Sequence, residues 1–272
     1  GLGDVYKRQF PHPNILMTND VQLKIKSMKD FVDIKNVFCD EESLTKACKY
    51  LSHLIKYPKT AEEINKNSHI WKEISDFLST KLAVRVWIKL SIAAYNNIKR
   101  HRTMVQSVES IHHAAKRALQ ELRHKKDSYE WVYVAKEIKE KSRLYNKYLN
   151  LTKNMLELYE KMKRAGIPIG DAIYILPHNI NVVVEALMNG YHIIDPFGFI
   201  GVRSCSKADF ELVNISNLIS HHLIKKFPLL KRLVGPKCKL GYCPEREFCS
   251  FIKKFSKNYN EEVHKRINEE LN

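Results

Sequence analysis

Residues 81–110 read KLAVRVWIKLSIAAYNNIKRHRTMVQSVES, and they give the clearest structural signal in the chain. From residue 84 to residue 90, aliphatic side chains alternate with basic and aromatic ones, which is the two-residue period of a half-buried strand. From Ser91 the pattern becomes short and rich in alanine, which favours a helix that ends in basic residues. The stretch therefore predicts a strand, then a helix, then a polar segment at residues 100–110.

Helical periodicity marks segments on both sides of this stretch. Residues 41–57 carry an apolar stripe with acidic residues at its start, where they suit the helix dipole, and Pro58 ends it. A second stripe spans residues 108–122 and a third spans residues 209–226. We predict a helix in each of these segments.

Two further segments complete the predicted fold. Residues 127–165 are the longest helical stretch, with a candidate capping box of Asp127 and Glu130 at its start. Residues 178–200 contain NINVVVEAL and YHIIDPFGFI, β-branched clusters broken by turn residues, which predict strands and turns. We therefore predict an α+β fold, a helix-rich single domain with one modest central sheet.

The bulk composition describes a globular chain. It has 272 residues, of which 44% are hydrophobic, enough for a sizeable core and far from the composition of disorder. No apolar run approaches the roughly 20 residues of a membrane-spanning helix, and the start lacks a signal-peptide pattern, so we expect a soluble, cytoplasmic protein. The opening GLGDVYKRQ has no amphipathic period, so we interpret residues 1–9 as a non-native leader and residues 10–272 as one domain.

The charge of the chain is strongly positive, with a formal net value of +16. Such a surplus raises the local concentration of anions, for example nucleotides, phosphorylated cofactors or nucleic acid. A solvated, lysine-rich surface explains the same number equally well. The charge alone therefore does not select a function.

Three of the six cysteines lie close together in the sequence, with the spacing C-x4-C-x5-C. These are Cys238, Cys243 and Cys249. The spacing lacks the paired C-x2-C knuckles of zinc sites, and the sequence shows no obvious fourth ligand. We therefore favour structural thiols, or a local cross-link under oxidising conditions, and assign no metal site.

No familiar nucleotide-binding or hydrolase motif is present. The loops GxGxxG and GxxxxGK[ST] are absent, and so are HExxH and Ser-His-Asp arrangements. The densest polar segment is residues 100–110, whose arginines suit the negative end of a helix dipole in a purely structural interpretation. The functional alternative is anion capture, because a guanidinium grips phosphate with two parallel bonds, a serine hydroxyl adds a donor, and neutral His101 both donates and accepts.

Four stretches, taken in order, carry a family resemblance. Residues 100–110 contain Arg-His-Arg, then seven residues, then a serine; residues 159–177 read YEKMKRAGIPIGDAIYILP. Residues 199–212 read FIGVRSCSKADFEL, and residues 235–249 read GPKCKLGYCPEREFC. Together they resemble the signature, the long helix with its Gly-x-Pro turn, the arginine-centred segment and the cysteine-containing tail of flavin-dependent thymidylate synthases. The resemblance is strongest over residues 80–250.

Membership of that family implies a homotetramer that holds FAD at subunit interfaces. The implied reaction moves a one-carbon unit from methylenetetrahydrofolate to deoxyuridine monophosphate (dUMP), with NADPH reducing the flavin. By matched position, Arg100, His101 and Arg102 are expected to contact the flavin, and Arg100 also to reach the nucleotide. Ser110 is expected at the nucleotide phosphate and Arg203 at the pyrimidine. The cofactor carries the hydride chemistry, and we assign no catalytic residue.

Several positions depart from the family pattern, mostly on the nucleotide side. They are Asn97 and Asp209 in place of glutamines, Val105 in place of a serine, Val108 in place of a glutamate (with Glu109 one position on), and His112 and Ile173 in place of arginines. An arginine lost from a phosphate site removes a charge-assisted bond of roughly 1.5–3 kcal/mol. Two such losses would weaken nucleotide binding by about two to four orders of magnitude. A protonated His112 would offset part of the loss, whereas Asp209 adds negative charge.

Two other hypotheses remain open. The first is a catalytically impaired relative, such as one half of a fused two-copy protein, that keeps the fold or the flavin. The second is a basic helical module that binds nucleic acid. Modules of that kind usually combine arginines with exposed aromatic residues on a sheet, whereas the aromatic residues of this chain mostly follow core-like spacing.

Overall fold

The structure of the chain is a computed structural model that describes residues 30–124, 129–245, 249–250, 252, 265–266 and 269–270. Its residues form two compact units, which we describe separately. In its described part, unit 1 comprises residues 30–31, Lys89–Lys99 and Ser107–Val184. Unit 2 comprises Val32–Ile88, Arg100–Gln106 and the described residues from Glu185 onward.

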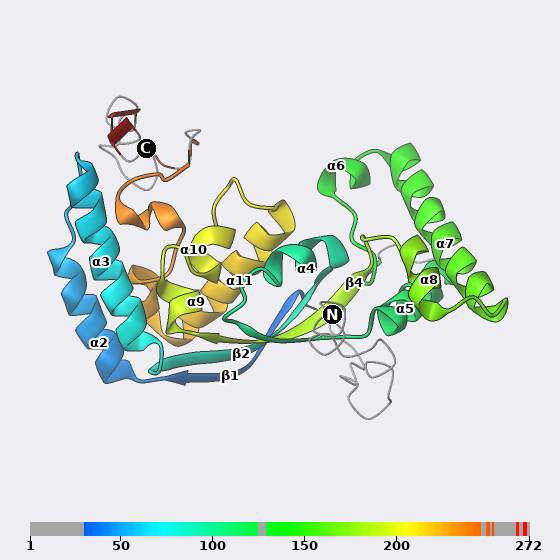
Figure 1. The fold of residues 1–272 in the computed structure, drawn as a ribbon, viewed down its shortest axis with the longest axis horizontal. Helices are drawn as coiled ribbons and strands as arrows, with labels where there is room; N and C mark the ends of the chain where they lie inside the picture. Colours follow the sequence, from blue (N-terminus) through cyan, green and yellow to red (C-terminus); the bar gives the residue numbers. More distant parts are fainter. Residues whose placement is uncertain are drawn as a thin grey trace, which may run out of the picture. The chain divides into compact units, whose positions relative to one another are not determined.

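Four strands form one sheet in the order β1-β2-β4-β3 (Figure 1). The strands are β1 (Val32–Cys39), β2 (Leu82–Ser91), β3 (Val105–Val108) and β4 (Asn181–Asn189). Strand β1 runs antiparallel to β2, with Val32 opposite Ile88 and Cys39 opposite Leu82. The register shifts between Ile34 and Asn36, which marks a bulge.

The predicted strand at residues 84–90 is confirmed as the centre of β2. Its aliphatic side chains are fully buried, namely Leu82, Val84, Val86, Ile88 and Leu90. Arg85 between them is exposed, as the two-residue period requires. The α+β class, with many helices and one modest sheet, is confirmed, whereas the assignment of residues 10–272 to one domain stays a prediction.

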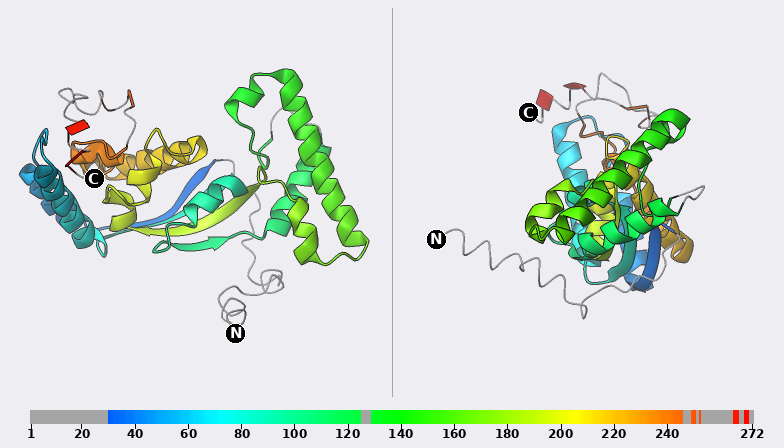
Figure 2. Two further views of the ribbon diagram at one scale, coloured as in Figure 1. Left: turned by 45° about the horizontal axis from the view of Figure 1, so that its top comes forward. Right: turned by 90° about the vertical axis from the view of Figure 1, so that its right-hand side faces the viewer.

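Unit 2 combines β1 and the first part of β2 with helices. They are α2 (Glu41–Tyr50), α3 (Ala61–Leu78), α9 (Gly190–Ile194), α10 (Phe199–Arg203) and α11 (Phe210–Lys226), with the 3₁₀ turns η3 (Leu51–His53), η5 (Pro228–Arg232) and η6 (Lys237–Leu240). Helices α2 and α3 lie side by side, and α11 packs against β1 (Figures 1 and 2). The predictions of helices at residues 41–57 and 209–226 are confirmed over α2 and α11; β1 and α3 were not predicted.

The segment YHIIDPFGFI contains the end of α9 and the start of α10, joined by a turn at residues 195–198, so the predicted turn at Pro196 is confirmed and the predicted strand is wrong. Asn189 and His192 form a capping box that starts α9 directly after β4. A Cβ on Gly190 would lie 2.4 Å from the carbonyl oxygen of Leu78, so only glycine lets α9 approach the end of α3 this closely. These contacts are distant in sequence, and they override the β-branched composition.

Unit 1 contains the remaining helices. They are α4 (Ile92–Ile98), α5 (Ile111–Arg123), α6 (Lys136–Lys139), α7 (Ser142–Arg164) and α8 (Ile169–Ala172), followed by the 3₁₀ turn η4 (Ile173–Ile175). The predictions of helices after Ser91 and at residues 108–122 are confirmed by α4 and α5. Helix α5 packs against α7 (Figure 1). No helix in the described ranges is long and apolar enough to cross a membrane.

The single helix predicted for residues 127–165 is replaced by an extended segment and two helices. The backbone N–H groups of Glu130 and Trp131 donate to the buried carboxylate of Glu121, both at 2.8 Å. Val132 then forms an antiparallel bridge with Ile180. These bonds hold the backbone extended, and α6 begins only at Lys136; the other predicted capping residue, Asp127, lies outside the described residues.

A buried ion pair joins the start of α5 to β4 within unit 1. The guanidinium of Arg117 donates two bonds to the carboxylate of Glu109, at 2.6 and 2.7 Å. The same carboxylate accepts the backbone N–H of Val183 at 3.1 Å. Arg117 also lies over the ring of Trp131, at 3.3 Å from its centroid. The carboxylate of Glu109 therefore has a structural role.

Replacing Glu109 by alanine should destabilise the protein by about 3–5 kcal/mol, because Arg117 keeps its charge in a largely buried position without a carboxylate. Urea unfolding followed by tryptophan fluorescence measures the loss. Glu140→Ala is the control, since it breaks a solvent-exposed pair with Lys136 and should cost at most about 1 kcal/mol. Equal losses in the two variants would contradict this role of Glu109.

Candidate functional site

The Arg100-His101-Arg102 segment forms a tight turn that leads into β3. The N–H of Arg102 donates to the carbonyl of Arg100, and the N–H of Met104 donates to the carbonyl of His101, both at 3.0 Å. Met104 is buried and anchors the turn. The turn leaves both arginines exposed and only His101 half-buried.

His101 contacts α10 of the same unit. Its ring lies edge-on to Phe199, with 5.3 Å between the centroids. The Nε of Arg203 donates to its Nε2 at 3.2 Å, and an imidazole nitrogen can accept only when it carries no proton. Burial, followed by the charges of Arg203 and His192, lowers the pKa of His101 to about 4. His101 is therefore a neutral acceptor at pH 7.

Arg203 brings positive charge to the same place. Burial lowers its pKa, and the charge of Arg100 lowers it further. Asp209 acts in the opposite direction. Arg100 and Arg203 are thus close enough to repel each other, and a bound anion would relieve that repulsion. The structure therefore brings together Arg100, His101 and Arg203.

Asp209 replaces a residue that the family pattern gives as glutamine. Its carboxylate caps α11 by accepting the backbone N–H groups of Glu211 at 2.9 Å and Leu212 at 3.4 Å. An aspartate at a helix N-cap is a stabilising choice in its own right. The substitution therefore has a structural explanation, although the carboxylate still acts on Arg203.

His192 is a neighbour of the turn that sequence reasoning missed. Its Nδ1 accepts the N–H of Asn189, so its proton is on Nε2, which lies 3.1 Å from the hydroxyl oxygen of Thr103. Burial lowers the pKa of His192. The sequence contains Asn189-Gly190 followed two residues later by His192. This pattern can be recognised as a capping box only once the helix that starts at Gly190 is known.

Ser110 belongs to unit 1 and stands at the N-cap position of α5. Its carbonyl accepts the N–H of Ala114, but its hydroxyl makes no capping bond. The start of a helix, with its N–H groups and a nearby hydroxyl, is suited to an anion. The phosphate role that the resemblance implies for Ser110 stays a prediction.

His112 follows Ser110 on α5, at a position where the family pattern has an arginine. Its Nδ1 is hydrogen-bonded to the hydroxyl of Tyr159 on α7, and the two rings stack. Burial, then the charges of Lys163 and His113, lower the pKa of His112. The ring therefore stays neutral at pH 7, and the expectation that a protonated His112 offsets the lost arginine is not supported.

Sequence comparisons identify a family and several relatives of this chain. The model of a family described as thymidylate synthase complementing protein matches residues 40–229. A flavin-dependent thymidylate synthase from Thermococcus onnurineus (strain NA1) is 29% identical over 127 residues, 45% of this chain and 51% of that protein. One from Pyrococcus abyssi is 30% identical over 119 residues, 42% and 48% of the two chains. One from Sulfurisphaera tokodaii is 30% identical over 172 residues, 57% and 63% of the two chains.

The family match covers well over half of the chain, so the chain belongs to the thymidylate synthase complementing protein family. This confirms the resemblance read from the sequence. At 29–30% identity to these relatives, it is a divergent member. The chain spans about half the length of the first two relatives that it matches.

His101 should make the stability of the protein depend on pH. Its folded pKa is about 4 and its ordinary value is 6.5, so the unfolded chain binds a proton that the folded chain does not. The stability due to neutral His101 is complete above pH 6.5 and is lost as the pH falls toward 4. The difference between the urea unfolding midpoints at pH 7 and pH 5 should therefore be smaller in His101→Gln than in the wild type. Arg203→Gln should have a smaller effect in the same direction, and parallel profiles in all three proteins would refute this.

Proposed function

We propose that this chain is a flavin-dependent thymidylate synthase-type methyltransferase. It holds FAD and transfers a one-carbon unit from methylenetetrahydrofolate to dUMP, with NADPH as reductant, as a cytoplasmic homotetramer. The observation that carries the proposal is the bond between His101 and Arg203, which lie 102 residues apart and belong to two different motifs of the family resemblance. A contact between two motifs that were identified separately supports their common role.

The donor set fits the phosphates of a flavin dinucleotide. Arg100 and Arg102 are exposed, and Arg203 is half-buried close to Arg100. Guanidinium groups bind pyrophosphate oxygens in pairs and keep their charge at any physiological pH. When bound, the flavin would supply hydride transfer.

The residues of the turn would bind and orient the cofactor and the nucleotide, and we assign them no proton transfer. His101 accepts a bond from Arg203, so it fixes the direction of that guanidinium without adding a third positive charge. Phe199 limits the rotation of the His101 ring. Arg203 would then face the pyrimidine ring of dUMP and Arg100 would lie between the cofactor and the nucleotide, as the family pattern implies.

The nucleotide side is the weaker part of the proposed site. Ser110 would donate its hydroxyl to the phosphate, together with N–H groups at the start of α5. Neutral His112 adds no charge there, and Ile173 lies in η4, where the family pattern has an arginine. These features favour weak dUMP binding and give specific support to the alternative of a catalytically impaired relative.

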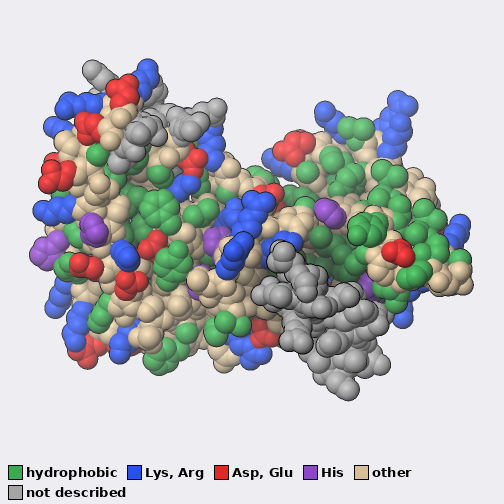
Figure 3. All heavy atoms as spheres, viewed as in Figure 1, with side chains coloured by type: hydrophobic (Ala, Val, Ile, Leu, Met, Phe, Trp, Pro, Cys, Tyr) green, Lys and Arg blue, Asp and Glu red, His purple; other side chains and the backbone are tan. Residues whose placement is uncertain are grey.

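The nucleic-acid alternative has less support. On the face drawn in Figure 3, lysine and arginine side chains lie in separate groups mixed with acidic ones. Binding to a nucleic acid backbone favours a continuous basic stripe. A steep salt dependence of RNA affinity would revive this alternative.

Titration of the purified chain with FAD tests the proposal. We expect flavin absorbance to co-elute with a tetramer in gel filtration and to be lost in Arg102→Ala, because one of the exposed cations of the turn is removed. Arg143→Ala is the matched control, an exposed arginine on α7 outside the proposed site. A flavin-free protein peak at saturating FAD, or equal losses in both variants, would overturn the proposed cofactor site.

Restoring an arginine at position 112 should strengthen dUMP binding. His112→Arg adds the charge-assisted bond that the neutral histidine lacks, roughly 1.5–3 kcal/mol, or about 10- to 100-fold in Kd. Isothermal titration of the FAD-loaded protein measures it. His113→Arg adds the same charge at an exposed neighbouring position and should change Kd little. An unchanged Kd in His112→Arg would show that α5 does not bind the phosphate.

A further inference from the structure

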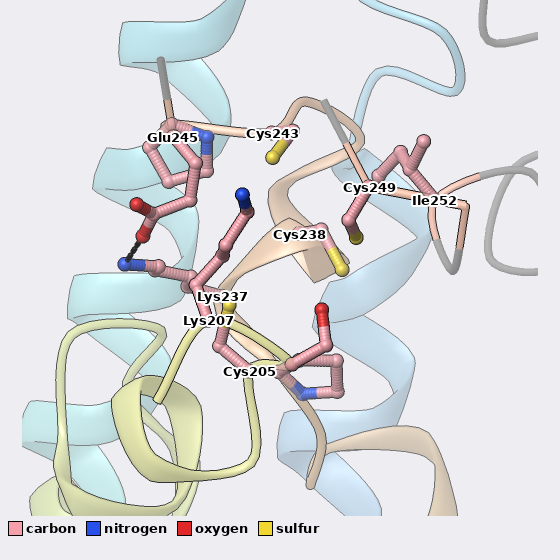
Figure 4. A pocket seen from close by; sticks show the side chains of 11 residues that line it. Cys205, Lys207, Lys237, Cys238, Cys243, Glu245, Cys249 and Ile252 are labelled. Carbon is pink, nitrogen blue, oxygen red and sulfur yellow. Dashed lines mark ion pairs between the residues drawn. The ribbon is translucent and has the colours of Figure 1, made fainter. Parts of the chain in front are cut away.

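Four cysteines from two separate segments line one small cavity in unit 2 (Figure 4). Cys205 follows α10, Cys238 lies in η6, and Cys243 and Cys249 follow η6. Cys238 and Cys243 are buried, and the other two are half-buried. The sequence offered three cysteines without a fourth ligand, and the fold supplies the fourth in Cys205.

The four side chains are close enough to influence one another. Burial is the main cause that raises the pKa of Cys238, to about 12, and Cys243, Cys205 and Cys249 add to it. Burial also raises the pKa of Cys243. Thiols of this kind are poor nucleophiles, which argues against a reactive or catalytic cysteine here. The cavity therefore brings together four cysteine side chains, which are soft metal ligands.

The four sulfur atoms line the cavity but do not stand at the spacing of a formed metal centre. All six cysteines of the chain are thiols. Among the described residues, no three His, Cys, Asp or Glu side chains already stand at the spacing of a formed metal centre. Rotation about χ1 moves a cysteine sulfur from one staggered position to another. Closure on a common point, at about 2.3 Å from each sulfur, therefore requires rotamer changes around the cavity.

The charges around the cavity suit a thiolate centre. Four thiolates around a divalent cation leave a net charge of about −2. Lys207 and Lys237 line the same cavity (Figure 4), and Lys237 also pairs with Glu245. The two lysines would offset part of the negative charge, as partners outside the ligand shell do in known metal sites.

We propose that Cys205, Cys238, Cys243 and Cys249 bind Zn²⁺ as a tetrahedral four-thiolate site. Binding would replace four S–H protons by four S–Zn bonds and release the protons to solvent. With four protein ligands the site has no open position, so its role would be to fix the segment after η6 against the end of α10. Three of the four cysteines lie beyond the matched residues 40–229, in the tail at residues 235–249, whereas Cys205 lies within the match.

Cobalt titration of the reduced, chelator-treated full chain tests the proposal. One Co²⁺ per chain should give the charge-transfer and d–d absorption of tetrahedral thiolate coordination, and Zn²⁺ should displace it. Cys205→Ser should weaken binding by more than about 100-fold, because loss of even an outer partner costs 10- to 100-fold. Cys39→Ser is the matched control, a half-buried cysteine on β1 of the same unit that does not line the cavity.

A second variant separates ligand loss from misfolding. Cys205→His keeps a ligand, so it should retain one Co²⁺ per chain with a shifted spectrum. Equal metal affinity in Cys205→Ser and wild type, or Co²⁺ absorption without thiolate bands, would overturn the site. So would a disulfide among the four cysteines in metal-free protein that still folds, or iron with acid-labile sulfide in the purified chain.

Discussion

The buried carboxylate of Glu109 is the contact on which unit 1 depends. It accepts two bonds from Arg117 and one from the backbone of Val183, so it joins the start of α5 to β4. Arg117 in turn lies over Trp131, at the start of the extended segment that precedes α6. A charge in this position is stable only with its partner. Glu109, which is displaced by one position from the glutamate of the family pattern, therefore has a structural role.

In unit 2 the corresponding constraint is the protonation of His101. Its Nε2 accepts from Arg203, so a second proton there would place two cations 3.2 Å apart. Because the ring is neutral, it orients the guanidinium of Arg203 without adding a further positive charge beside Arg100. This is how a strongly basic segment can bind an anion with a defined geometry.

The two units differ in how closely they follow the family pattern. The turn of Arg100, His101 and Arg102 keeps its signature, and its partner Arg203 is present. On α5, Ser110 keeps a hydroxyl that caps nothing, while His112 is held neutral against Tyr159. The proposed flavin side is thus better preserved than the proposed nucleotide side, which is the division that an impaired or altered relative would also show.

The sequence by itself determined the elements whose signals are local. The alternation in β2, the periodic stripes of α2, α5 and α11, and the signature at residues 100–110 were all readable from neighbouring residues. Tertiary structure decided what depends on distant partners. Gly190 against Leu78 made α9 a helix, Glu121 broke the long helix predicted from residue 127, and α10 placed Cys205 with three cysteines more than thirty residues away. Each of these outcomes rests on one close contact between distant segments, which composition and periodicity do not encode.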